Sequence, residues 1–144
     1  MKSTILTIVA IASFYLLNAQ ERESFDCSIL SGTIASKEFT DHFHIKKSTD
    51  PLEIIDTANY FGSCKLENLE GRKVAVGSKY PNNVDVNKGS GKENQHKIIL
   101  YELKQNGRVY CVSFWQPYGN ANLVLQIKLR KNKYRVKLIS AGVF

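Results

Sequence analysis

Apolar and polar residues alternate near the C-terminus, and this alternation is the feature that most constrains the fold. Every second position of residues 123–130 holds a large aliphatic side chain: Leu123, Leu125, Ile127 and Leu129. A second alternating segment follows at residues 134–138. Because successive side chains of a strand point to opposite faces, each segment would bury one face and expose the other. The pattern predicts neighbouring strands of a sheet with one apolar and one polar face.

Two further strands are predicted at residues 98–105 and 109–115, which are rich in β-branched and aromatic side chains. Asn106-Gly107 stands between them, and this dipeptide suits the two successive positive φ angles of a tight hairpin turn. Turn residues at 117–120 and 131–133 separate the remaining strands. We therefore predict an antiparallel meander of four consecutive strands.

The apolar face of this sheet needs a cover, and residues 50–61 carry the strongest helix signals. Asp50 can cap a helix, Pro51 suits its first position, and Glu53 completes a capping box three residues after the cap. We predict a helix over this segment. The alternative is a buried strand over residues 52–55, because a short apolar run fits either structure.

Short strands are also predicted at residues 28–35 and 42–46, before this helix, and at residues 73–76, after it. Residues 77–95 contain few apolar side chains and are expected to form a long mobile loop. The predicted fold is α+β, with one helix of the N-terminal half packed on an antiparallel meander of about four to five strands.

In element order this arrangement resembles the cystatin-like and NTF2-like folds, in which a sheet wraps around a helix. The resemblance rests on the succession of a strand, a helix and several antiparallel strands, and no sequence motif of either family accompanies it. It implies an architecture and no function, because such folds host enzymes, inhibitors and binding modules alike.

The first nineteen residues predict a signal peptide. Lys2 provides a positive start, and the uncharged run at residues 5–17 is shorter than the ~20 residues needed to cross a membrane. Ala19 is a suitable residue to precede the cleavage site. We expect residues 1–19 to be removed and residues 20–144 to form a single exported domain, periplasmic or secreted, with no transmembrane anchor.

Charge and cysteine content agree with an exported binding domain. The chain carries +7, and loss of Lys2 with the signal peptide leaves +6, which favours acidic partners. Cys27, Cys64 and Cys111 all follow the predicted signal peptide, so an oxidising compartment favours one disulfide and one remaining thiol. The three possible pairings stay open, although Cys111 lies in an apolar strand pattern and fits a buried small side chain.

Two groups of residues form the predicted binding surface. Cations alternate out of two neighbouring strands between residues 128 and 137, and an aromatic segment spans residues 110–118. Strand geometry places Trp115 on one face with Val109 and Cys111, and Tyr110 with Phe114 on the other. Aromatic and cationic side chains dominate protein interfaces. The candidate binding residues are Tyr110, Phe114, Trp115, Tyr118, Lys128, Arg130, Lys133, Arg135 and Lys137.

Motifs for catalysis, metals or cofactors are weak. His42 and His44 have the spacing to share one strand face, with His96 or Asp50 as a distant third ligand, but no third ligand lies nearby in the sequence. The Gly89-Ser90-Gly91-Lys92 stretch lacks the spacing of a phosphate-binding loop. We assign no catalytic residue, metal or cofactor, and expect no nucleic-acid partner.

The hypothesis that follows is a small exported binding protein rather than an enzyme. Its partner is expected to be an acidic protein or an anionic envelope surface, and an inhibitor or immunity-type role fits such a partner. The alternative is a structural or small-ligand-carrying module of the envelope with an apolar pocket. A hydrolase is a third hypothesis, for which His42 and Cys111 are the only candidates. The oligomeric state stays open.

Overall fold

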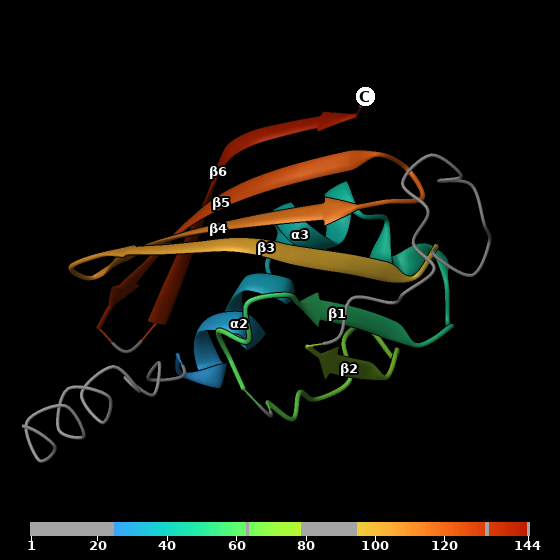
Figure 1. Cartoon of the computed structure of the whole chain (residues 1–144), viewed down its shortest axis with the longest axis horizontal. Coiled ribbons are helices and arrows are strands. Elements are labelled where there is room, and N and C mark those ends of the chain that lie inside the picture. Colours follow the sequence, from blue (N-terminus) through green and yellow to red (C-terminus); the bar gives the residue numbers. More distant parts are fainter. Residues whose placement is uncertain (1–24, 63, 79–94, 132, 144) are drawn as a thin grey trace, which may run out of the picture.

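Six strands form one mixed sheet in the order β2-β1-β3-β4-β5-β6, and short helices cover one of its faces (Figure 1). The computed structural model describes residues 25–62, 64–78, 95–131 and 133–143. The helices come first in the chain: α2 (Cys27–Ile34), α3 (Lys37–His42) and the 3-10 turn η1 (Ile45–Lys47). The strands follow as β1 (Leu52–Asp56), β2 (Val74–Gly77), β3 (Lys97–Asn106), β4 (Val109–Gln116), β5 (Ala121–Arg130) and β6 (Lys133–Val143).

The antiparallel meander predicted for the C-terminal part is confirmed. Strands β3 to β6 pair in sequence order, and Gly107 takes a φ of +58° in the turn between β3 and β4. Local signals suffice here because each strand pairs with the next one along the chain. Strand β6 continues to Val143, beyond the alternating segment that predicted it.

The helix predicted over residues 50–61 is wrong, and the alternative of a buried strand is correct. Strand β1 pairs in parallel with both β2 and β3, so it lies inside the sheet. Ile54 and Ile55 point to opposite faces and are both fully buried. Aliphatic residues with no polar face are what an interior parallel strand requires. The strand ends at Asp56, whose carboxylate accepts a hydrogen bond of 2.7 Å from the backbone N–H of Phe61.

No strand stands at residues 28–35 or 42–46, where strands were predicted: α2 occupies the first segment, and the end of α3 with the start of η1 occupies the second. The Asp26 carboxylate caps α2 by accepting from the Ser28 N–H at 2.8 Å, and the Ser36 hydroxyl caps α3 by accepting from the Phe39 N–H at 3.3 Å. The strand prediction missed these caps. Gly32 lets α2 approach the sheet, because a Cβ there would lie 3.1 Å from the ring of Tyr134 on β6.

The predicted class, α+β with helix packed on sheet, is confirmed, whereas the predicted element order is wrong because the described helices α2, α3 and η1 come before β1. The sheet has six strands instead of four to five. The short strand expected at residues 73–76 is present as β2. The expected mobile loop falls mainly on residues 79–94, which lie outside the described residues, as does the predicted signal peptide. Within the described part, no helix has the length and apolar character to cross a membrane.

A hydrophobic core fills the space between the helices and the sheet. Phe39 of α3 meets Phe114 of β4 edge to face at 5.1 Å between ring centroids, and both side chains are fully buried. A disulfide joins Cys27, at the start of α2, to Cys64, in the connection between β1 and β2. The structure thus selects one of the three pairings left open, and Cys111 is a free, half-buried thiol.

Candidate functional site

Five of the predicted binding residues lie together on the sheet face that points away from the helices. In the register of β5 and β6, Lys128 stands opposite Arg135, and Arg130 opposite Lys133. Their neighbours Ile127 and Val136 pack in the core, so alternation turns the cations to the outer face. We call this set the basic face; its members are Lys128, Arg130, Lys133, Arg135 and Lys137, all exposed.

No carboxylate of the described residues pairs with the charges of the basic face. The sequence from residue 103 to residue 144 contains five Lys and three Arg but no Asp or Glu. On β3, Lys104 binds Glu102 at 2.7 Å, and this contact raises the pKa of Lys104. No ion pair between described residues includes a member of the basic face. Like charges directly opposite one another on a sheet are destabilising, so this arrangement carries a cost that an anionic partner would relieve.

The aromatic half of the predicted surface does not join the basic face. Trp115 shares a face with Val109 and Cys111, as predicted, and this is the outer face, but Trp115 stands opposite Asn122 on β5. Asn122 is six residues from Lys128, which corresponds to about 20 Å along a strand. The Trp115 indole N–H donates to Asn120 Oδ1 at 3.2 Å.

Two other aromatic candidates belong to the helix side of the sheet, and for Phe114 the prediction of a contact residue was wrong. Phe114 is fully buried in the core and has no surface to offer a partner. Tyr110 is half-buried and meets Phe25 edge to face at 6.1 Å. Tyr118 is exposed, but it lies in the turn between β4 and β5, far along the sheet from the basic face.

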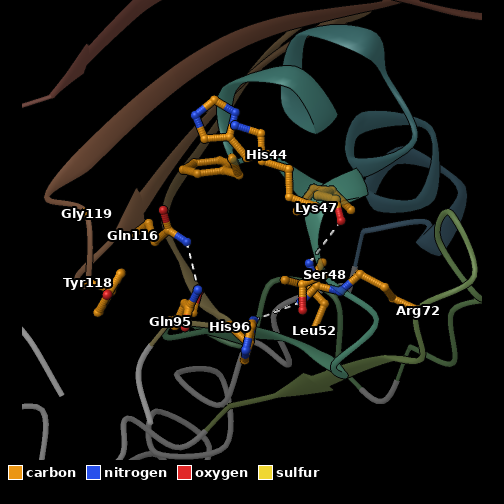
Figure 2. A pocket seen from close by; sticks show the side chains of 12 residues that line it. His44, Lys47, Ser48, Leu52, Arg72, Gln95, His96, Gln116, Tyr118 and Gly119 are labelled. Carbon is orange, nitrogen blue, oxygen red and sulfur yellow. Dashed lines mark hydrogen bonds between the residues drawn. The ribbon is translucent and has the colours of Figure 1, made fainter. Parts of the chain in front are cut away.

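A cavity of about 290 Å³ opens at the end of the sheet where β1 and β3 begin (Figure 2). Because β1, β2 and β3 run parallel, their first residues meet at this end of the sheet. The turn after β4 and the segment after α3 complete the walls. We call it the edge cavity; its described lining residues are Phe43, His44, Ile45, Lys47, Ser48, Leu52, Arg72, Gln95, His96, Gln116, Tyr118 and Gly119.

Arg72 organises the edge cavity through three hydrogen bonds. Its side chain is buried, with only 3% of the residue exposed. Nε donates to the backbone oxygen of Asp50 at 2.6 Å, and Nη1 donates to the backbone oxygen of Ile45 at 3.3 Å. Nη2 contacts Nδ1 of His96 at 3.1 Å. Burial lowers the pKa of Arg72, and attraction to Asp50 opposes that effect.

The contact with Arg72 fixes the tautomer of His96. A guanidinium group can only donate hydrogen bonds, so Nδ1 of His96 must accept. The imidazole proton therefore lies on Nε2, which donates to Oδ2 of Asp50 at 2.9 Å. His96 thus links the buried arginine to an exposed carboxylate, and both of its nitrogens are occupied.

The paired histidines considered as metal ligands do not share a strand face. His42 ends α3, and its pKa is lowered mainly by burial, against the opposing effect of a backbone hydrogen bond with Asn122. Its Nε2 is buried and has no partner among the described residues. His44 follows in a left-handed conformation and turns to the edge cavity. The described residues contain no cluster of three or more His, Cys, Asp or Glu suited to a metal.

His42 and Cys111, the two residues weighed for a hydrolase, lie on opposite sides of the sheet. His42 belongs to the helix layer, whereas Cys111 stands opposite Lys104 and Gln126 on the outer face. A nucleophile and its base must lie within hydrogen-bond reach. The structure therefore keeps these two groups from acting as a catalytic pair.

Sequence reasoning missed the edge cavity and its central residue. Arg72 precedes β2 and reads as an ordinary surface cation, because burial of an arginine leaves no local pattern. Asp50 and His96 were considered only as a helix cap and as a distant metal ligand. Comparison of the chain with protein-family models, curated proteins and solved structures finds no match.

Proposed function

We propose that the mature domain is an exported binding protein whose basic face docks on the acidic surface of another protein. The observation that carries this proposal is the set of five exposed cations on one sheet face with no carboxylate from residue 103 onward. Such a field steers an acidic partner toward the face and selects against basic ones. An inhibitor or immunity-type protein, which must capture one partner quickly, is the role that this arrangement suits best.

An acidic protein is favoured over a membrane or a soluble polyanion by what borders the basic face. Strand β6 is the sheet edge, and beyond Lys137 it exposes Ile139 by 51% and, on the helix side opposite Leu125, Leu138 by 46%. Protein interfaces combine an apolar centre with a polar rim, whereas polyanion sites depend on charge alone. The adjacent apolar residues therefore supply contact area that a protein partner would cover.

The alternative role of carrying an apolar ligand has less support. Such a role needs an apolar cavity. Among the described residues, fully buried side chains such as Phe39, Phe114 and Leu125 fill the space between helices and sheet. The edge cavity combines an apolar wall with polar and basic side chains and suits a different ligand.

The test compares two triple variants of residues 20–144 that lose the same charge. R130Q/K133Q/R135Q removes the centre of the basic face, and K37Q/K65Q/K73Q removes three exposed lysines from other parts of the molecule. Each protein is used to capture partners from envelope and culture extracts. A captured protein is then purified, and its association rate is measured at low and high salt, with hydrogen exchange to locate its contacts.

The proposal predicts an acidic protein that binds the parent and the control, loses affinity for the basic-face variant, and protects β5 and β6 from exchange. Its association rate should fall as salt is added. Equal binding to both variants would overturn the proposal. The proposal would also be overturned if the parent bound acidic phospholipid vesicles and captured no protein, because the basic face would then bind a membrane surface.

A further inference from the structure

We infer that the edge cavity is a binding site for a small organic anion, held through a carboxylate or phosphate group. This site is separate from the basic face, and the inference does not depend on the proposed function. It rests on the charge of the lining, on two N–H groups of a buried arginine from which no described residue accepts a hydrogen bond, and on the apolar part of the wall.

The described lining carries basic side chains and no carboxylate. His44 and Lys47 come from the segment after α3, while Arg72 and His96 stand just before β2 and β3. Asp50 is the nearest carboxylate in the network, but it is 65% exposed at its side chain and is not part of the lining. An anion placed in the cavity would therefore face cations and neutral donors.

Arg72 has hydrogen-bonding capacity left for such an anion. A guanidinium group has five N–H donors, and the contacts to Asp50, Ile45 and His96 use three of them. No described residue accepts from the other two. Two of the three acceptors are backbone carbonyls and the third is an imidazole nitrogen, so no carboxylate of the described residues contacts the buried charge directly. A bound oxyanion would supply the missing negative charge and accept hydrogen bonds from the two remaining N–H groups. Arginine binds carboxylate and phosphate with this forked geometry.

Neighbouring side chains are held in place without competing for the ligand. His96 uses Nδ1 and Nε2 on Arg72 and Asp50, so it positions the arginine rather than contacting the anion. Gln116 Nε2 donates to the backbone oxygen of Gln95 at 3.0 Å, which ties the end of β4 to the start of β3 (Figure 2). The exposed Lys47 then provides a second, adjustable cation at the mouth.

The size and walls of the cavity limit the ligand further. A volume of 290 Å³ equals that of about ten water molecules in the liquid. Phe43, Ile45 and Leu52 form an apolar part of the wall. The site therefore fits a compact molecule with one anionic group and a short apolar body.

The experiment measures calorimetric binding of benzoate and of inorganic phosphate to residues 20–144, with benzyl alcohol as the neutral counterpart of benzoate. We expect benzoate or phosphate to bind and benzyl alcohol not to bind. Benzoate binding would identify a carboxylate ligand, and phosphate binding would identify a phosphate ligand. Equal binding of benzyl alcohol and benzoate would overturn the inference, as would the absence of binding by both anions up to about 10 mM.

Matched variants locate the site. K47Q should weaken anion binding about tenfold, because it removes one charge-assisted contact. K128Q removes the same charge from the basic face and should leave the affinity unchanged; an equal loss in both variants would mean unspecific attraction and would overturn the inference. R72K keeps the charge but loses the forked geometry, and it should abolish binding. If R72K does not fold, H44Q/K47Q replaces it, and retained affinity in that variant would likewise overturn the inference.

Discussion

Removing the disulfide between Cys27 and Cys64 should lower the free energy of unfolding by several kcal/mol. The two cysteines are separated by 37 residues. In the chain-entropy treatment, a cross-link that closes a loop of this size lowers the conformational entropy of the unfolded state by about 13 cal/mol/K. At 25 °C this stabilises the folded state by about 4 kcal/mol. A small domain is stable by only about 5–15 kcal/mol, so the loss would be a large fraction of the total.

The double variant C27A/C64A tests this value by urea denaturation against the parent. C111A is the matched control, because Cys111 is a free thiol and closes no loop. The control should stay within about 1 kcal/mol of the parent, since it removes one half-buried sulfur. Reduction of the parent should reproduce the double variant. A double variant as stable as the parent would refute the reasoning, because residues 27–64 would then be constrained without the bond.

Three further changes test the described structure. Phe39→Ala should cost about 3–5 kcal/mol of unfolding free energy in urea denaturation, because it empties a fully buried ring site; a cost below about 1 kcal/mol would argue against the packing on Phe114. Ser36→Ala should cost about 0.5–2 kcal/mol by the same assay through loss of the α3 cap, and Ser36→Thr should recover part of it. Burial lowers the pKa of His42 below its unfolded value of about 6.5, so its contribution to stability is complete above that pH and is lost as the pH falls toward the folded pKa. His42→Phe should therefore flatten the decline in urea midpoint between about pH 6.5 and 5, and an unchanged slope would contradict this assignment.

The C-terminal meander could be predicted because its signals are local. Alternation over residues 123–130 assigns each side chain to a face, and Asn106-Gly107 locates the hairpin between β3 and β4 to within one residue, because Asn106 pairs with Val109 and the turn is Gly107-Arg108. The same alternation correctly placed the basic residues on one polar face, although it gave no measure of their distance from Trp115. That distance follows from strand register, which sequence patterns outside the turns do not report.

The N-terminal half could not be predicted in the same way, because its strands pair over long distances. Asp50, Pro51 and Glu53 form a local helix signal, yet β1 gains partners at residues 74–77 and 97–100. An isolated helix of eight to twelve residues is only marginally stable in water. Burying the side chains of this segment on both faces of the sheet therefore outweighs its helix propensity. The edge cavity has the same origin, since it combines residues from segments that only the fold brings together.

The mixed pairing of β3 has a consequence for how the molecule assembles. On one side β3 pairs with β4, which follows it after a two-residue turn, while on the other side it pairs with β1, so that Ile54 stands beside Ile98. Closing a long loop costs more entropy than closing a hairpin, so nearby contacts form faster than distant ones. The meander is therefore expected to form first and to present the free edge of β3 as a template. Strands β1 and β2 dock on that template afterwards, and the edge cavity comes into existence only with this last step of folding.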